Sequence, residues 1–119
     1  MPLVRIEMIK GHSPEFRRTL LDCVHESLMA TLGTEDWDRF QRIVEIEPEN
    51  FETAPGKTEH FMIIEITLFP GRTPLQKKHL IEHLTSSLVE RLQIAATDVF
   101  IVIHEPANEN WGLGGVQRQ

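Results

Sequence analysis

Residues 3–32, LVRIEMIKGHSPEFRRTLLDCVHESLMATL, share their pattern of apolar side chains with residues 63–92, IIEITLFPGRTPLQKKHLIEHLTSSLVERL, 60 positions further along without a gap. In each stretch the apolar residues first alternate and then recur at the spacing of one helix face, which indicates a strand followed by a helix. The alternating pattern then returns, where Asp38, Phe40, Ile43 and Glu45 align with Asp98, Phe100, Ile103 and Glu105. The sequence therefore predicts a β-α-β unit that occurs twice.

The starts of the two predicted helices carry matching signals. Ser13-Pro14 and Thr73-Pro74 each supply an N-cap residue followed by proline at the first helical position, and Gln76 completes a capping box in the second. We expect the helices to run to about residues 32 and 92, with strands at about 3–9, 40–46, 61–69 and 99–104. The chain thus predicts a single domain over residues 1–119. Its halves are 1–46 and 61–106, joined by a polar connection at 47–60 and followed by a tail at 107–119 that is too rich in glycine for a helix.

The predicted elements define a fold class. Strand–helix–strand crossovers are right-handed, so each half should pair its two strands in parallel. Two such halves predict an α+β fold, a two-layer sandwich in which two helices cover one face of a four-stranded sheet. The runs at 61–64 and 100–103 are apolar on both sides, which a sheet with one wet face avoids. We therefore expect another subunit to cover the second face, and hence a homo-oligomer.

Composition excludes several classes of partner. The net charge of −6 argues against binding to nucleic acid or to an anionic membrane surface. Cys23 is the single cysteine, so no internal disulfide can form, and its place in a helical pattern predicts a buried thiol rather than a nucleophile. No apolar stretch approaches the roughly 20 residues of a membrane span, and the N-terminus lacks the features of a signal peptide. These observations predict a soluble, cytoplasmic protein.

Pro2 directly follows Met1 and directly precedes the strand predicted at 3–9. Removal of Met1, which a small second residue favours, would leave a secondary amine at the head of that strand. An α-amino group has an unperturbed pKa of about 7.7–8.0, so burial or a nearby cation can make it a neutral base near pH 7. The alternative is that Pro2 only opens the strand, as proline commonly does. In the second half its place is taken by Met62, an ordinary strand residue.

Two charged residues stand next to predicted elements. Arg72 precedes the second helix, so its guanidinium and the positive end of that helix predict a carboxylate or phosphate site, although a solvated turn arginine fits as well. Asp38 stands just before the second strand, where its carboxylate could orient the Pro2 amine, activate water or pair with Arg39. Its repeat mate Asp98 lies in an ordinary turn pair, so Asp38 could equally be a turn residue.

Other candidates come from the first helix, the second helix and the tail. His25 borders the apolar stripe of the first helix, so it is either a packed amphipathic side chain or a substrate-binding group that reaches the end of the sheet. Trp111 could wall off a substrate pocket or fasten the tail onto a neighbour. Residues 79–83 read HLIEH, the pattern of the inverted zinc peptidases, but the apolar residues around it explain that helix by core packing. We expect no metal and no other cofactor.

Taken together, these features resemble the tautomerase superfamily over nearly the whole chain. The resemblance rests on the proline after the initiator methionine, the tandem β-α-β halves, FPGRTP at 69–74 and NENWG at 108–112. It implies a trimer with the N-terminal proline at the floor of each pocket. On this resemblance Pro2 matches the catalytic proline, Asp38 the carboxylate that works with it, and Arg72 one of the substrate-binding arginines.

Within the superfamily the chain is most similar to the malonate semialdehyde decarboxylase branch, through LLDCVH at 20–25 and WDRFQ at 37–41. The cis-3-chloroacrylic acid dehalogenases share a histidine that matches His25 and an arginine that matches Arg72. The decarboxylase carries two arginines in the segment that matches residues 69–74, whereas in this chain the first of them is replaced by Pro70. The loss of one guanidinium favours tautomerisation over decarboxylation.

We therefore expect an isomerase, a proline-dependent tautomerase of small 2-oxo acids in which Pro2 transfers the proton and Arg72 holds the substrate carboxylate. One alternative is an activity like that of malonate semialdehyde decarboxylase or hydratase, with Arg39 or Arg5 replacing the missing arginine, or like that of the haloacrylate dehalogenases. An alternative of another class is a non-catalytic trimeric interaction protein, and a third is a small ligand-sensing domain. The expected assembly is a homotrimer, and the expected partner is a small carboxylate substrate.

Overall fold

The computed structural model describes residues 2–119, so the removal of Met1, on which the catalytic hypothesis depends, lies outside the described residues. The long elements are β1 (Leu3–Ile9), α1 (Pro14–Leu32), β2 (Phe40–Ile46), β3 (Met62–Thr67), α2 (Pro74–Leu92) and β4 (Val99–His104). The tail adds the short strands β5 (Gly112–Leu113) and β6 (Val116–Gln117). Both helices and the strands β1, β2 and β4 have the bounds that the sequence predicted.

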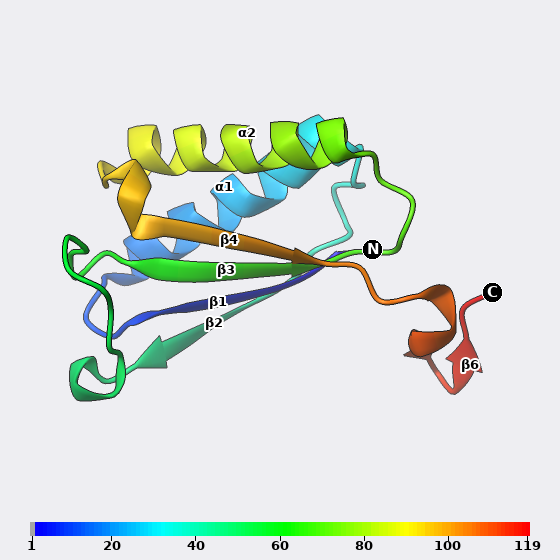
Figure 1. The fold of residues 1–119 in the computed structure, drawn as a ribbon, viewed down its shortest axis with the longest axis horizontal. Helices are drawn as coiled ribbons and strands as arrows, with labels where there is room; N and C mark the ends of the chain where they lie inside the picture. Colours follow the sequence, from blue (N-terminus) through cyan, green and yellow to red (C-terminus); the bar gives the residue numbers. More distant parts are fainter. Residues whose placement is uncertain (1) are drawn as a thin grey trace.

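The four long strands form one mixed sheet in the order β2-β1-β3-β4. The strands of each half are parallel, with Leu3 facing Phe40 in the first half and Met62 facing Val99 in the second. The central strands β1 and β3 are antiparallel. Both helices lie on the same face of the sheet (Figure 1). The predicted α+β two-layer sandwich is confirmed.

The central strand pair contains the pseudo-two-fold axis of the repeat. Arg5 pairs with Glu65, which is its own mate at the offset of 60 residues. The sheet therefore has two quasi-equivalent ends. At the Pro2 end, β1 and β2 begin while β3 and β4 finish; at the Met62 end, β3 and β4 begin while β1 and β2 finish.

The core lies between the sheet and the helices. Alternate side chains of the two central strands are fully buried, namely Val4, Ile6, Met8, Met62, Ile64 and Ile66. The helices contribute the buried stripes Leu20, Val24, Leu28, Leu80, Leu84 and Leu88. Cys23 is buried beside them as the sequence indicated, and burial raises the pKa of its thiol.

The helices begin at the predicted caps. Ser13 Oγ accepts a hydrogen bond from the Phe16 backbone N–H at 3.0 Å, and Thr73 forms a complete capping box with Gln76. These side chains satisfy N–H groups that have no partner inside the helix, which fixes both start points. No helix within residues 2–119 combines the length and the apolar content needed to cross a membrane.

The structure differs from the prediction at β3 and in the tail. β3 spans Met62–Thr67 rather than residues 61–69: Leu68 donates a last hydrogen bond to the His104 carbonyl, and Pro70 has no N–H with which to continue the ladder. The tail forms a hairpin around Gly114 and Gly115, whose φ angles of 61° and 82° favour glycine. The hairpin lies beyond the end of the four-stranded sheet (Figure 1).

Truncation of Leu84 to alanine is expected to lower the free energy of unfolding by about 2–5 kcal/mol, because this side chain is fully buried between α2 and the sheet. Ile81→Ala on the same helix is the matched control, since that side chain is 40% exposed and should cost far less. Urea denaturation followed by circular dichroism measures both. Equal losses in the two variants would contradict this assignment of the helix faces.

Candidate active site

Pro2 is buried at the Pro2 end of the sheet, directly before β1. Its neighbour Leu3 lies between Phe40 of β2 and Thr67 of β3 in the ladder. The loop that leads into β2 (residues 33–39) and the loop that follows β3 (residues 68–73) therefore meet at the residue that would carry the free amine. The sequence placed Asp38 and Arg72 on these two loops.

Arg72 lies in the second of these loops, immediately before α2. Its side chain is half-buried, and its Nε is buried without a hydrogen-bond partner among residues 2–119. The capping box already uses the N–H groups of Thr73 and Gln76. The guanidinium, rather than the capped N–H groups, is therefore the group at this helix start that could bind an anion. A buried donor without a partner is costly, and a bound carboxylate would satisfy it.

Asp38 is only 7% exposed and lies in the turn before β2, where its backbone N–H donates to the Glu35 carbonyl at 3.0 Å. Its neighbour Arg39 pairs instead with Asp22 of α1, with Nη2 2.9 Å from Oδ1. Arg5, the other arginine considered as a substitute for the missing guanidinium, lies 3.5 Å from Glu7. Both of these arginines already have an acidic partner, which leaves Arg72 as the better candidate to hold a substrate carboxylate.

His25 is buried in α1, with 2% of its surface exposed. Its Nε2 lies 2.9 Å from the Asp36 carbonyl oxygen, so Nε2 carries a proton and donates it. The second nitrogen, Nδ1, is buried without a hydrogen-bond partner among the described residues. This hydrogen bond therefore connects the loop of residues 33–39 to α1.

Trp111 anchors the tail at the Pro2 end. Its indole N–H donates to the Pro106 carbonyl at 3.1 Å, and its ring meets that of Phe69 edge-on with centroids 4.7 Å apart. Together with Leu3 and Phe40 these rings line a cavity of about 450 Å³ that the tail hairpin closes on one side. Trp111 therefore lines a cavity, and its role as the wall of a substrate pocket stays a prediction.

The tail hairpin that forms one side of this cavity is not among the elements predicted from the sequence. Leu113, Gly114, Gly115 and Val116 have the composition of a two-residue hairpin turn between apolar positions. The excess of glycine also argues against a helix in this tail. The turn signal was present and could have indicated a hairpin.

The Met62 end is the quasi-equivalent of the Pro2 end, and its polar side chains bind one another and the backbone. Asp98, the mate of Asp38, accepts hydrogen bonds from the Thr58 backbone N–H at 2.9 Å and from the Thr58 hydroxyl at 2.5 Å. His12, the mate of Arg72, contacts the Ile9 carbonyl and His60 at 3.0 and 3.1 Å. The connection at 47–60 thus fills this end with its own polar groups.

Asp98→Asn is expected to destabilise the fold by about 1–3 kcal/mol, because the carboxylate accepts two hydrogen bonds in a site with 1% exposure. Its activity should remain at the level of the unsubstituted protein. Asp38→Asn should show the opposite pattern, a drop in kcat with a smaller loss of stability. Thermal unfolding and turnover, measured on both variants, separate these roles. Equal loss of turnover in the two would contradict the difference between the ends.

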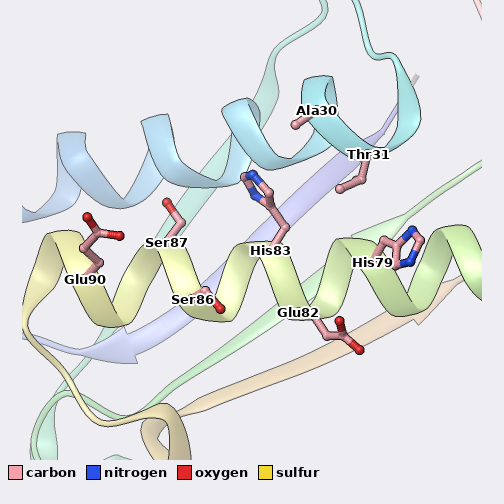
Figure 2. Close-up of a pocket in the computed structure, with 8 residues that line it drawn as sticks. All are labelled: Ala30, Thr31, His79, Glu82, His83, Ser86, Ser87 and Glu90. Carbon is pink, nitrogen blue, oxygen red and sulfur yellow. The ribbon is translucent and has the colours of Figure 1, made fainter.

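Another groove, of about 670 Å³, lies between α1 and α2. Figure 2 shows that His83 points towards α1 whereas Glu82 points away from it. His83 Nδ1 is bound to Ser27 Oγ at 2.8 Å. Within residues 2–119 no group of three or more His, Cys, Asp or Glu side chains is placed to hold a metal ion. The HLIEH segment therefore does not form a ligand set.

Comparisons with known proteins match most of the described chain. A family model described as tautomerase enzyme matches residues 38–114, and a second model of the same description matches residues 2–56. The probable tautomerase YrdN of Bacillus subtilis (strain 168) is 32% identical over 124 residues, which cover 96% of this chain and 92% of the relative.

Solved structures share the fold. FG41 malonate semialdehyde decarboxylase, inhibited by 3-bromopropiolate, is 32% identical with a TM-score of 0.84, and the match covers 94% of this chain and 88% of that one. A fused 4-OT asymmetric trimer has a TM-score of 0.87 at 24% identity, with 97% and 94% covered. The first structure supports relatedness beyond the fold, and the second supports the fold.

Proposed function

Since this chain belongs to the tautomerase family, we propose that it catalyses the keto–enol tautomerisation of small 2-oxo acids, with the amine of Pro2 transferring the proton. It is an enzyme of the tautomerase type. The observation that carries the more specific proposal is the composition of the Pro2 end. A buried proline at the start of β1 meets the loop of Arg72, whose buried Nε has no partner among residues 2–119.

The proposed reaction moves one proton between oxygen and carbon. Arg72 binds the carboxylate of the enol form and presents the hydroxyl to the Pro2 nitrogen. The neutral amine removes the hydroxyl proton as the carbon–oxygen double bond forms, and the resulting ammonium returns a proton to the neighbouring carbon. No proton is gained or lost overall, and the amine ends the cycle neutral.

The surroundings of Pro2 favour its role as a base. Burial and a neighbouring positive charge both disfavour an ammonium ion, so in this proposal they keep the amine neutral. Asp38 acts in the opposite direction and stabilises the ammonium after the first proton transfer. His25 is a positioning residue in this proposal, because it acts through its hydrogen bond to the Asp36 carbonyl, two residues before Asp38.

We also propose that the protein assembles as a homotrimer. The sheet face opposite the helices carries the large exposed side chains Phe40 and Phe100, which are 47% and 56% exposed. A surface of this kind is typical of an interface between subunits. The solved fused 4-OT structure of the same fold is described as a trimer. Analytical ultracentrifugation measures the oligomeric state, and a monomer at micromolar concentration would contradict the proposed trimer.

A second candidate is decarboxylation of a 3-oxo acid, favoured by the 32% identity to FG41 malonate semialdehyde decarboxylase. In that reaction a protonated Pro2 would polarise the carbonyl, so the required ionisation state is the reverse of that in tautomerisation. The pH dependence of kcat/KM separates the two. A rate that falls as the pH drops indicates the base, and a rate that falls as the pH rises indicates the acid.

The proposed function is tested with protein that carries a free Pro2 terminus. Intact mass of the protein from its native host reports whether Met1 has been removed, and ketonisation of phenylenolpyruvate reports turnover. We expect a mass lacking one methionine and a rate well above that of buffer alone. A mass corresponding to all 119 residues would rule out the amine as the catalytic group.

A further inference from the structure

Arg118 holds a fixed guanidinium at the tail. Its central carbon lies 3.7 Å from the centroid of the Phe69 ring, and its Nε donates to Asn108 Oδ1 at 3.0 Å. Its backbone N–H donates to the Trp111 carbonyl at 3.0 Å. None of these contacts neutralises the charge, and no carboxylate within residues 2–119 forms an ion pair with Arg118. The side chain is held in place while its terminal nitrogens stay available.

The same guanidinium lines the cavity between the tail and the start of the sheet. The other lining residues are uncharged, and most are apolar or aromatic, among them Leu3, Phe40, Phe69 and Trp111. Arg118 is therefore the one charged group among the described residues that line this space. A charge beside apolar walls interacts more strongly with an opposite charge than it would in open water.

The cavity wall includes residues that neighbour Pro2 and Arg72 along the chain, although neither of these two residues lines it. Leu3 belongs to its wall and directly follows Pro2, while Phe69 belongs to its wall and precedes Arg72 by three residues. The ring of Phe69 packs against the tail through both Trp111 and Arg118. A ligand held by Arg72 at one side of Phe69 could thus extend over apolar surface towards Arg118.

We propose that Arg118 is a specificity-determining residue of this enzyme, which binds a second anionic group at the far end of an apolar segment of the substrate. The tail would then select carboxylic acids that carry a further carboxylate over those that end in a neutral group. This inference rests on the proposed function, which places the reacting end of the substrate at Pro2 and Arg72. What it adds concerns the binding of the other end of the substrate. Binding can be measured without turnover.

The test is isothermal titration of the full chain with two unreactive ligands, 3-phenylpropanoate and 3-(4-carboxyphenyl)propanoate. They share one carboxylate and a ring, and only the second ligand has a carboxylate at the far end. We expect the dianion to bind about tenfold more tightly or better, as one charge-assisted hydrogen-bonded pair allows. Arg118→Gln should abolish this advantage, because a planar amide can still stack on Phe69 and bond to Asn108 without the charge.

Two further variants act as controls. Arg18→Gln removes the same charge from an exposed position on α1 and should leave the advantage of the dianion unchanged. Arg118→Lys keeps the charge and should retain most of the affinity advantage of the dianion. Equal binding of the two ligands by the unsubstituted protein would overturn the proposal. So would an equal loss of affinity for both ligands in Arg118→Gln. Tighter binding of the dianion by a protein that does not catalyse ketonisation would overturn the proposed function but not this inference.

Discussion

Replacement of Pro2 by alanine is expected to lower kcat/KM for phenylenolpyruvate ketonisation by about 100-fold or more, since general acid–base catalysis contributes roughly 10²–10⁴-fold. The variant keeps an amine at the terminus, but this amine is no longer held by a ring at the buried start of β1. Misplacement of a proton-transferring group lowers the rate more than it lowers substrate binding. The loss should therefore fall mainly on kcat, which steady-state kinetics measures directly.

A second variant separates the amine from the proline ring. Extension of the chain by two residues before Pro2 converts its nitrogen into an amide, which has no basic lone pair, while the ring itself is retained. This protein should have no more activity than Pro2→Ala. Full activity in the extended protein would show that the terminal amine has no part in the reaction.

Arg72→Ala is expected to raise KM for phenylenolpyruvate by about 10- to 100-fold, the size of one or two lost charge-assisted hydrogen bonds. The physical reason is that Arg72 offers the half-buried guanidinium at the Pro2 end whose Nε has no partner among residues 2–119. Initial rates over a wide substrate range give kcat and KM separately. The change should fall mainly on KM if Arg72 holds the carboxylate throughout the reaction.

Two controls define the role of Arg72. Arg72→Lys restores the charge without the planar pair of donors and should recover only part of the affinity. Arg18→Ala removes an exposed arginine of α1 and should leave KM as it is. An unchanged KM in Arg72→Ala, in protein that folds normally by circular dichroism, would remove Arg72 from the substrate site.

The sequence was sufficient to predict the fold because the spacing of apolar residues indicates each strand and helix locally. Each half carries its own strand pattern, its capped helix and its second strand, and the offset of 60 residues supplied an internal check on each element. Both helices run over the 19 residues between their predicted caps and stops. Mates that face each other in the antiparallel pair, such as Arg5 and Glu65, follow from the same symmetry.

The candidate site was only partly predictable. Pro2, Asp38 and Arg72 could be singled out because each stands beside the start of an element, where chains that are distant in sequence meet at one edge of a sheet. The tail cavity was predicted only through Trp111, since Trp111 and Arg118 reach it by packing on Phe69, 42 and 49 residues away in sequence. Such contacts depend on how the tail folds back, and no local pattern encodes them.

From the sequence alone follow the two β-α-β units, their order and the difference between Pro2 and Met62 at matching positions. Which of the two quasi-equivalent ends stays available follows from tertiary structure. The connection at 47–60 folds back onto the Met62 end, where Thr58 satisfies Asp98 across 40 residues of chain. At the Pro2 end the guanidinium Nε of Arg72 is left without such a partner among residues 2–119. The physical reason is that periodicity reports which face of an element is buried, whereas the filling of a cavity depends on contacts between distant segments.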